Sequence, residues 1–266
     1  MLRHKQVWLT AGLAATIFVA EAASKKVNQR AIQRLPKSAL AAAFQVAASA
    51  GSSIYEIRAV HDPHGIGKFY MGREIARVMG PGGISWLDRP EREEEEHPRV
   101  VIDALGLRCG EFVADLGAGS GFFTFRLAPK VCKSGKVLAV DIQDEMLETI
   151  RERAARLHVT NVEEVKGTAT DPKLPANALD LVLMVDVYHE LEFPYEVMTK
   201  VRAALKPNGR VVFIEYRKED LRVAIKELHK MSLEQLEKEM RAVGLVPAPT
   251  VETLPSQHIA IFKKSD

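Results

Sequence analysis

Residues 112–122 read FVADLGAGSGF, and this stretch decides the fold. Its first five residues form an apolar run typical of a buried strand, and a helix is predicted over 122–128. Between them, Gly117, Gly119 and Gly121 allow a tight turn and a close approach of the backbone to a ligand. The N–H groups that open the helix can then bind a carboxylate or a phosphate.

Strands and helices alternate on the carboxyl-terminal side of this stretch, which predicts a parallel sheet covered by helices on both faces, a three-layer α/β fold. The predicted strands are 112–116, 136–140, 162–166, 179–185, 210–215, 251–254 and 258–262, and the predicted helices are 122–128, 145–157, 195–205 and 232–243. A further helix is predicted from Pro98, and a short one over 74–79.

Two carboxylates accompany the glycine turn. Asp115 stands two residues before Gly117 and can hold an ammonium group, and Asp141 follows the next strand, where a carboxylate accepts hydrogen bonds from ribose hydroxyls. The spacing G-x-G-x-G, with Phe122 after the last glycine, favours S-adenosylmethionine (SAM) over a nicotinamide dinucleotide, whose usual pattern is G-x-G-x-x-G. A NAD-linked oxidoreductase stays as a less favoured alternative.

Four motifs in order resemble the class I SAM-dependent methyltransferases, in particular the ubiquinone/menaquinone-biosynthesis-like group. They are DLGAGSG (115–121), VDIQDEML (140–147), LDLVLMVDVYHEL (179–191) and LKPNGRVVFIE (205–215). The resemblance covers residues 97–266. It implies a seven-stranded sheet of order 3-2-1-4-5-7-6 with an antiparallel last strand, and SAM as the cofactor.

The resemblance also implies which residues bind SAM: Asp115, Gly117, Ala118, Gly119, Gly121, Asp141, Ile142, Met146, Thr168, Ala169 and Val185. Asp115 would approach the amino group of SAM, and Asp141 its ribose. Thr168 stands where the family usually has an aspartate that contacts the adenine amino group. Asp171 is a candidate substitute for that aspartate.

The best catalytic candidate is His189, because it follows the fourth strand, where the reactive methyl group should lie, and a base assists a hydroxyl acceptor. Asp186 shares the loop and is a second candidate. The alternative is that His189 only shapes the cofactor pocket. No metal is expected at the site.

The segment ahead of this domain, residues 55–97, is expected to form a helical or lid extension. Its residues 61–73 read HDPHGIGKFYMGR and look like a leader found in exported, uncharacterised bacterial members of the superfamily. Lys68, Tyr70 and Arg73 are predicted to belong to a substrate lid, and His61, Asp62 and His64 are an alternative metal set. Residues 88–96, DRPEREEEE, are expected to be a solvated helix face.

The first 54 residues are predicted to be a targeting segment. Residues 1–55 contain seven Lys or Arg and one acid, Glu21, and the run from Val7 to Ala20 is mostly apolar. A signal peptide for export is the expected interpretation, with a membrane anchor or an organellar presequence as alternatives. The positive excess lies in this segment, so the sequence does not predict nucleic-acid binding. For an exported chain, Cys109 and Cys132 could form a disulfide, or stay as two thiols.

These observations predict an enzyme that transfers a methyl group from SAM to a small molecule, or to a lipid or quinone at a membrane. A non-catalytic module that binds SAM or another nucleotide is the alternative. The sequence specifies neither the acceptor nor the oligomeric state.

Overall fold

The computed structural model describes residues 54–265, and Tyr55–Asp266 form one compact unit. The predicted targeting segment therefore lies outside the described residues. Across residues 54–265, no helix combines the length and the apolar character that crossing a membrane requires.

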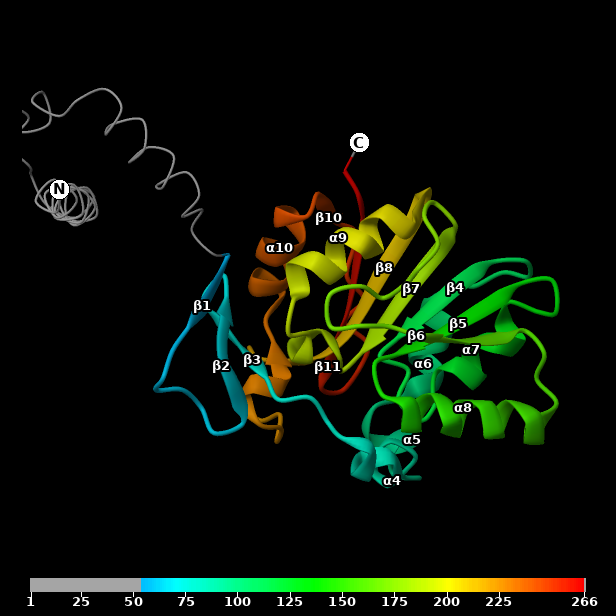
Figure 1. Cartoon of the computed structure of the whole chain (residues 1–266), viewed down its shortest axis with the longest axis horizontal. Coiled ribbons are helices and arrows are strands. Elements are labelled where there is room, and N and C mark those ends of the chain that lie inside the picture. The colour runs from blue at the N-terminus through cyan, green and yellow to red at the C-terminus, as the bar shows by residue number, and fades with distance from the viewer. Residues whose placement is uncertain (1–53, 266) are drawn as a thin grey trace, which may run out of the picture. The chain divides into compact units, whose positions relative to one another are not determined.

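A twisted central sheet organises this unit (Figure 1). Its order, from one edge to the other, is β6-β5-β4-β7-β8-β11-β10, which confirms the predicted 3-2-1-4-5-7-6 arrangement. Strand β11 is antiparallel to both of its neighbours, as expected for the last strand. The strands are β4 (Phe112–Leu116), β5 (Lys136–Asp141), β6 (Val162–Lys166), β7 (Leu179–Val185), β8 (Leu205–Arg217), β10 (Leu245–Pro247) and β11 (Gln257–Lys264), with β9 (Lys230–Met231) paired to the end of β8.

Helices cover both faces of the sheet because the strands are apolar on both sides. Val113 and Leu181 face α6 (Pro98–Ala104) and α7 (Thr124–Lys130), and Ala139 on the same face packs against α8 (Asp144–Leu157). The alternate residues, such as Val182 and Met184, face α9 (Pro194–Ala204) and α10 (Leu233–Ala242). The three-layer α/β fold predicted from the alternation of strands and helices is thus confirmed.

Two predicted elements were wrong. The penultimate strand is β10 rather than 251–254, where Val251 makes one isolated bridge to Ile259. The helix predicted over 74–79 is instead the strand β3 (Arg73–Ala76), because Met71 and Gly72 form a turn with positive φ that returns the chain along β2 (Gly65–Tyr70). The spacing of apolar residues over 74–79 fits a helix and does not reveal that β3 pairs with β2.

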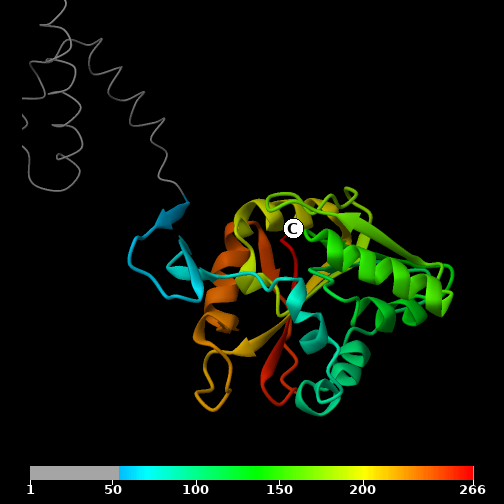
Figure 2. The same cartoon turned by 60° about the horizontal axis from the view of Figure 1, so that its bottom comes forward.

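Residues 55–97 begin with a small antiparallel sheet rather than a helix. Its strands are β1 (Tyr55–Ile57), β2 (Gly65–Tyr70) and β3, in that order. Strand β3 contacts two 3-10 turns, η2 (Tyr188–Glu190) and η3 (Glu227–His229), so the small sheet lies beside the main one (Figures 1 and 2). Three short helical segments follow: η1 (Pro81–Gly83), α4 (Ile84–Leu87) and α5 (Arg92–Glu95).

A buried ion pair connects the small sheet to the main domain. Arg73 on β3 donates two hydrogen bonds to Glu239 on α10, at 2.9 and 3.0 Å, and a third to the backbone oxygen of His189 at 3.2 Å. Both charged side chains are almost fully buried. One arginine therefore joins three segments that are far apart in the sequence.

The substitution Arg73→Met should lower the free energy of unfolding by about 3–5 kcal/mol, because it leaves the buried Glu239 carboxylate without its cation. Urea denaturation measures this difference. The matched control is Arg241→Met, which breaks an exposed pair with Glu237 on the same helix and should cost less than about 1 kcal/mol. Equal losses for both variants would contradict the role given to Arg73.

A disulfide joins Cys109, which precedes β4, to Cys132, which follows α7, with 4.9 Å between the Cα atoms. It closes a loop with a sequence separation of 23 residues. Replacing Cys132 by Ser should lower the free energy of unfolding by about 3 kcal/mol, because the bridge restricts the unfolded chain.

Reductant should lower the free energy of unfolding of the wild type by the same amount as the Cys132→Ser substitution, as measured by thermal unfolding with and without reductant. The Cys132→Ser variant should show no effect of reductant. Alkylation followed by mass spectrometry tests the pairing itself: both thiols should be labelled only after reduction, and labelling without reduction would contradict it.

Candidate functional site

A cavity of about 500 Å³ opens at the carboxyl ends of β4, β5 and β7, where open α/β sheets bind their ligands. This volume lies within the roughly 300–1,000 Å³ range of small-molecule sites. Of the residues predicted to bind SAM, the ones that line it are Gly117, Gly119, Asp141, Ile142, Met146, Thr168, Ala169 and Val185, and both catalytic candidates, Asp186 and His189, line it too.

The glycine turn forms part of the cavity wall. Gly117 and Gly119 have φ values of +74° and +54°. A Cβ on Gly117 would lie 2.5 Å from Val187, and one on Gly119 would lie 2.8 Å from Leu87. Side chains at these positions would be strained by the positive φ and would collide with Val187 and Leu87, so glycine lets the backbone of the turn lie close against these cavity residues. Ala118 and Gly121 are not among the lining residues; a Cβ on Gly121 would meet Phe125 instead.

Asp141 closes β5 and turns its carboxylate toward the cavity. One oxygen accepts a hydrogen bond from the Gly119 N–H at 3.0 Å, and the other from the Gln143 N–H at 2.9 Å. A carboxylate has about four acceptor sites, so acceptor capacity remains for a ligand. The remaining capacity suits a ribose hydroxyl. Burial raises the pKa of Asp141 above its usual value.

Asp115 is placed differently from the expectation that it approaches the ligand. Its carboxylate is buried, accepts a 2.6 Å hydrogen bond from the Thr124 hydroxyl, and is not part of the cavity wall. Burial raises its pKa to about 6. In this structure Asp115 fixes the start of α7 behind the glycine turn.

The loop after β6 supplies Thr168 and Ala169 to the wall, but not the proposed substitute for the family's aspartate. The carboxylate of Asp171 accepts a hydrogen bond from the Lys173 N–H at 2.8 Å and pairs with the Lys173 ammonium group. Asp171 is not among the lining residues. Thr168 therefore remains the polar side chain of this loop at the cavity.

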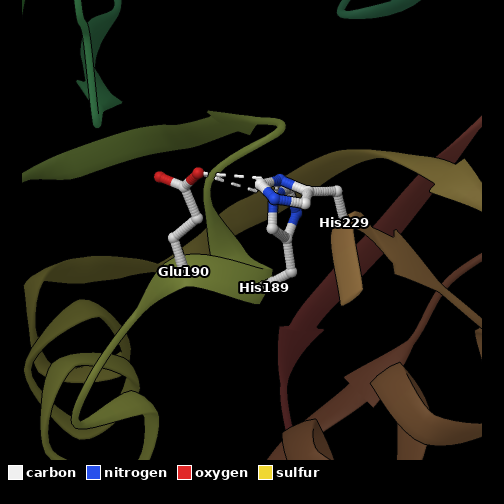
Figure 3. A group of neighbouring side chains, drawn as sticks. All are labelled: His189, Glu190 and His229. Atoms are coloured by element: carbon white, nitrogen blue, oxygen red, sulfur yellow. Dashed lines mark hydrogen bonds and ion pairs between the residues drawn. The ribbon is translucent and has the colours of Figure 1, made fainter. Parts of the chain in front are cut away.

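His189 is held by a carboxylate that the sequence did not reveal as a partner. The Glu215 carboxylate on β8 lies 2.6 Å from His189 Nδ1, and the ring Nε2 lies 3.0 Å from Nδ1 of His229 (Figure 3). Burial lowers the pKa of His189, but the charge and hydrogen bond of Glu215 outweigh it and raise this pKa. Burial and the nearby His189 lower the pKa of His229 to about 4. Glu190, beside both, has a pKa raised by burial to about 7.

The prediction that residues 88–96 form a solvated face was wrong for two of its members. Arg92 and Glu96 are buried, are paired at 2.6 Å, and line the cavity. Arg92 also lies 3.9 Å from Asp186, whose carboxylate accepts hydrogen bonds from Gln257 at 2.9 Å. Burial, and then the charges of Glu96 and Glu215, raise the pKa of Asp186 to about 8.

The leader around residues 61–73 contributes less to the cavity than expected. Lys68, Tyr70 and Arg73 do not line it; the residues from this side that do are Ile66, Ala76, Val78, Met79, Trp86 and Leu87. His61 faces Glu74 at 3.1 Å, and among the described residues the alternative metal set of His61, Asp62 and His64 does not converge on one point.

Comparisons with known proteins identify the family. Residues 108–260 match the family model described as a methyltransferase domain, which is more than half of the chain. The chain belongs to the class I SAM-dependent methyltransferases.

This methyltransferase is 32% identical over 121 residues to the ubiquinone/menaquinone biosynthesis C-methyltransferase UbiE of Cronobacter sakazakii, with the match covering 45% of this chain and 48% of that protein. It thus spans about half the length of the curated relatives it matches. A crystal structure of a SAM-dependent methyltransferase from Aquifex aeolicus is 28% identical, with a TM-score of 0.65, over 70% of this chain and 98% of the other. The PH0226 protein from Pyrococcus horikoshii, 19% identical over 69% and 95% of the two chains with a TM-score of 0.54, shares the fold.

The raised pKa of Asp186 predicts how stability depends on pH. Between its ordinary value of 3.8 and about 8, the folded chain keeps a proton on Asp186 that the unfolded chain releases. The raised pKa of Asp186 therefore adds to the free energy of unfolding at low pH, and this addition is lost as the pH rises from 3.8 to about 8.

Asp186→Asn should flatten the fall of the free energy of unfolding between pH 5 and 8, by at most about 1.4 kcal/mol per pH unit. Urea denaturation at several pH values measures the slope. Asp144→Asn, at an exposed carboxylate on α8, is the control and should leave the slope unchanged. A slope in Asp186→Asn equal to that of the wild type would show that Asp186 ionises normally.

Proposed function

We propose that this chain transfers a methyl group from SAM to a small organic acceptor that binds at the His189 end of the cavity. The observation that supports this most directly is the continuity of the site: Gly117, Gly119, Asp141 and His189 all line one cavity. A cofactor held at the strand ends and an acceptor beside His189 would then meet inside a single enclosed space.

The residues present fit SAM. Asp141 retains acceptor capacity for a ribose hydroxyl, and the glycine turn brings the backbone of Gly117 and Gly119 to the cavity wall. Ile142 and Met146 supply apolar surface beside Asp141 for the adenine, and Glu96 and Asp186 also line the cavity. When bound, SAM supplies an activated methyl group on a positively charged sulfur.

His189 would orient and deprotonate the acceptor. Because Glu215 accepts the hydrogen on Nδ1, Nε2 is the ring nitrogen of His189 that can take a proton from an acceptor hydroxyl, once the acceptor replaces His229 Nδ1 as its partner at 3.0 Å. The imidazolium that results is stabilised by the Glu215 carboxylate, as the raised pKa of His189 indicates. Asp186 stays protonated near neutral pH and contributes a hydrogen-bond donor to the same wall.

The acceptor is proposed to have an apolar body. The cavity is lined by apolar side chains that include Trp86, Leu87, Val187, Leu191 and Ile225. Val78, Trp86 and Ile142 also line the cavity and are about half exposed, so its margin offers apolar surface to solvent. A quinone-like or lipid-like acceptor whose tail lies on this margin is the second candidate, and the name of the UbiE relatives is consistent with it.

Calorimetric titration of the full chain with SAM and with its demethylated product tests the cofactor. Asp141→Ala should weaken binding at least tenfold, because it removes the acceptor for the ribose hydroxyls. Asp144→Ala, three residues away and exposed, should bind like the wild type. A folded wild type that binds neither compound would refute the proposal.

Release of the demethylated product in the presence of catechols, phenols and hydroquinones tests turnover. Binding without product release from any acceptor class would favour a non-catalytic SAM-binding module over the proposed enzyme.

A further inference from the structure

Three potential metal ligands converge on one point of the cavity. They are Nε2 of His189 and Oε1 of Glu190, both on η2, and Nδ1 of His229 at the end of η3 (Figure 3). The two nitrogen atoms lie 3.0 Å apart, and Glu190 Oε1 lies 3.9 Å from His189 Nε2 and 3.7 Å from His229 Nδ1. Two imidazoles and one carboxylate are a ligand set that divalent transition ions use.

The orientation of His189 suits a ligand. The Glu215 carboxylate has no hydrogen to donate, so the hydrogen in the 2.6 Å contact lies on Nδ1 of His189 and the lone pair lies on Nε2. The second oxygen of Glu215 accepts the Tyr188 N–H at 2.8 Å, which prevents the carboxylate from turning away. A carboxylate behind a histidine, fixing its tautomer, is the usual arrangement around metal-binding histidines.

The other two ligands need only small movements. Ligands bonded at about 2.1 Å in a tetrahedral site lie about 3.4 Å apart, so the two nitrogen atoms would separate by a few tenths of an ångström and Glu190 would approach by a similar amount. The other oxygen of Glu190 accepts the Met79 N–H at 3.2 Å, which leaves Oε1 directed at the histidines. All three side chains line the cavity, so an ion here would have its open coordination position on the cavity side.

We infer that His189, Glu190 and His229 bind one divalent first-row transition ion, with Zn²⁺ as the best fit, at the acceptor end of the cavity. The open position would take an oxygen atom of the acceptor, which narrows the acceptor class to compounds with a hydroxyl or enol oxygen. This last step rests on the proposed function, whereas the metal site itself does not. With the ion bound, Nε2 of His189 is a ligand and the ion acidifies the acceptor hydroxyl in its place.

The test uses the full chain without an affinity tag, freed of metal by a chelator and titrated with Zn²⁺ and with Co²⁺. The expected result is one ion per chain, with visible Co²⁺ absorption of a four- or five-coordinate site. His229→Gln and Glu190→Gln should each weaken Zn²⁺ binding at least tenfold. His158→Asn, which replaces an exposed histidine remote from the site, should bind Zn²⁺ like the wild type.

The inference is overturned if the wild type takes up no stoichiometric ion, or if both variants bind Zn²⁺ as tightly as His158→Asn does. The first result would leave a proton shared between the two histidines as the explanation of their contact. X-ray absorption of the Zn²⁺-loaded wild type gives a reading that needs no variant: two imidazole ligands are expected, and a shell of oxygen atoms alone would overturn the site. SAM titration of the same metal-free protein separates the two failures, because SAM binding without metal binding contradicts only this inference.

Discussion

The site depends on how two buried carboxylates hold the short turn Tyr188–Glu190. Glu215 accepts the Tyr188 N–H and the His189 ring hydrogen, and Glu239 accepts the Tyr188 hydroxyl at 2.6 Å as well as both hydrogen bonds from Arg73. Both glutamates are fully buried, so each unmade bond would leave a desolvated polar group. The turn therefore has little freedom, and His189 is fixed before any ligand enters.

This arrangement also explains why the small β1–β3 sheet is part of the same compact unit as the methyltransferase fold. Arg73 donates hydrogen bonds to Glu239 and to the backbone oxygen of His189. These bonds hold strand β3 beside the cavity. The residues that follow β3 then pass along the cavity wall. Covering the site and stabilising the domain are thus consequences of the same contacts.

The sequence predicted most of the fold and several residues that line the cavity, but not their partners on other segments, and this division has a physical basis. DLGAGSG and Asp141 were found because a turn near a ligand requires glycine and a strand end requires a specific carboxylate, so both constraints are local. Glu215 and His229 were missed because their roles depend on which segments become neighbours, and nothing in their own surroundings in the sequence marks them. The burial of Arg92 and Glu96 was missed for the same reason, since six consecutive charged residues, 91–96, are typical of a solvent-exposed helix.

Strand β3 shows a related limit. Its four residues are too few to show a period, and their pairing with β2 depends on the turn at Met71 and Gly72. Helix α10 was easier to predict, because its capping residue and the partner of that residue are only three positions apart. The Ser232 side chain accepts the Gln235 N–H, as the spacing indicated. Local rules succeeded where the stabilising partner lies within a few residues, and failed where it lies on another segment.

Trp86 gives the cavity a built-in optical probe. It lines the wall, is about half exposed, and has the guanidinium of Arg89 3.7 Å from the centre of its ring. The chain has two tryptophans, and the other, Trp8, belongs to the predicted targeting segment. The emission of the folded domain thus comes from one indole at the mouth of the cavity, and its intensity and wavelength will follow the arrival of any molecule that displaces water or the guanidinium from that ring.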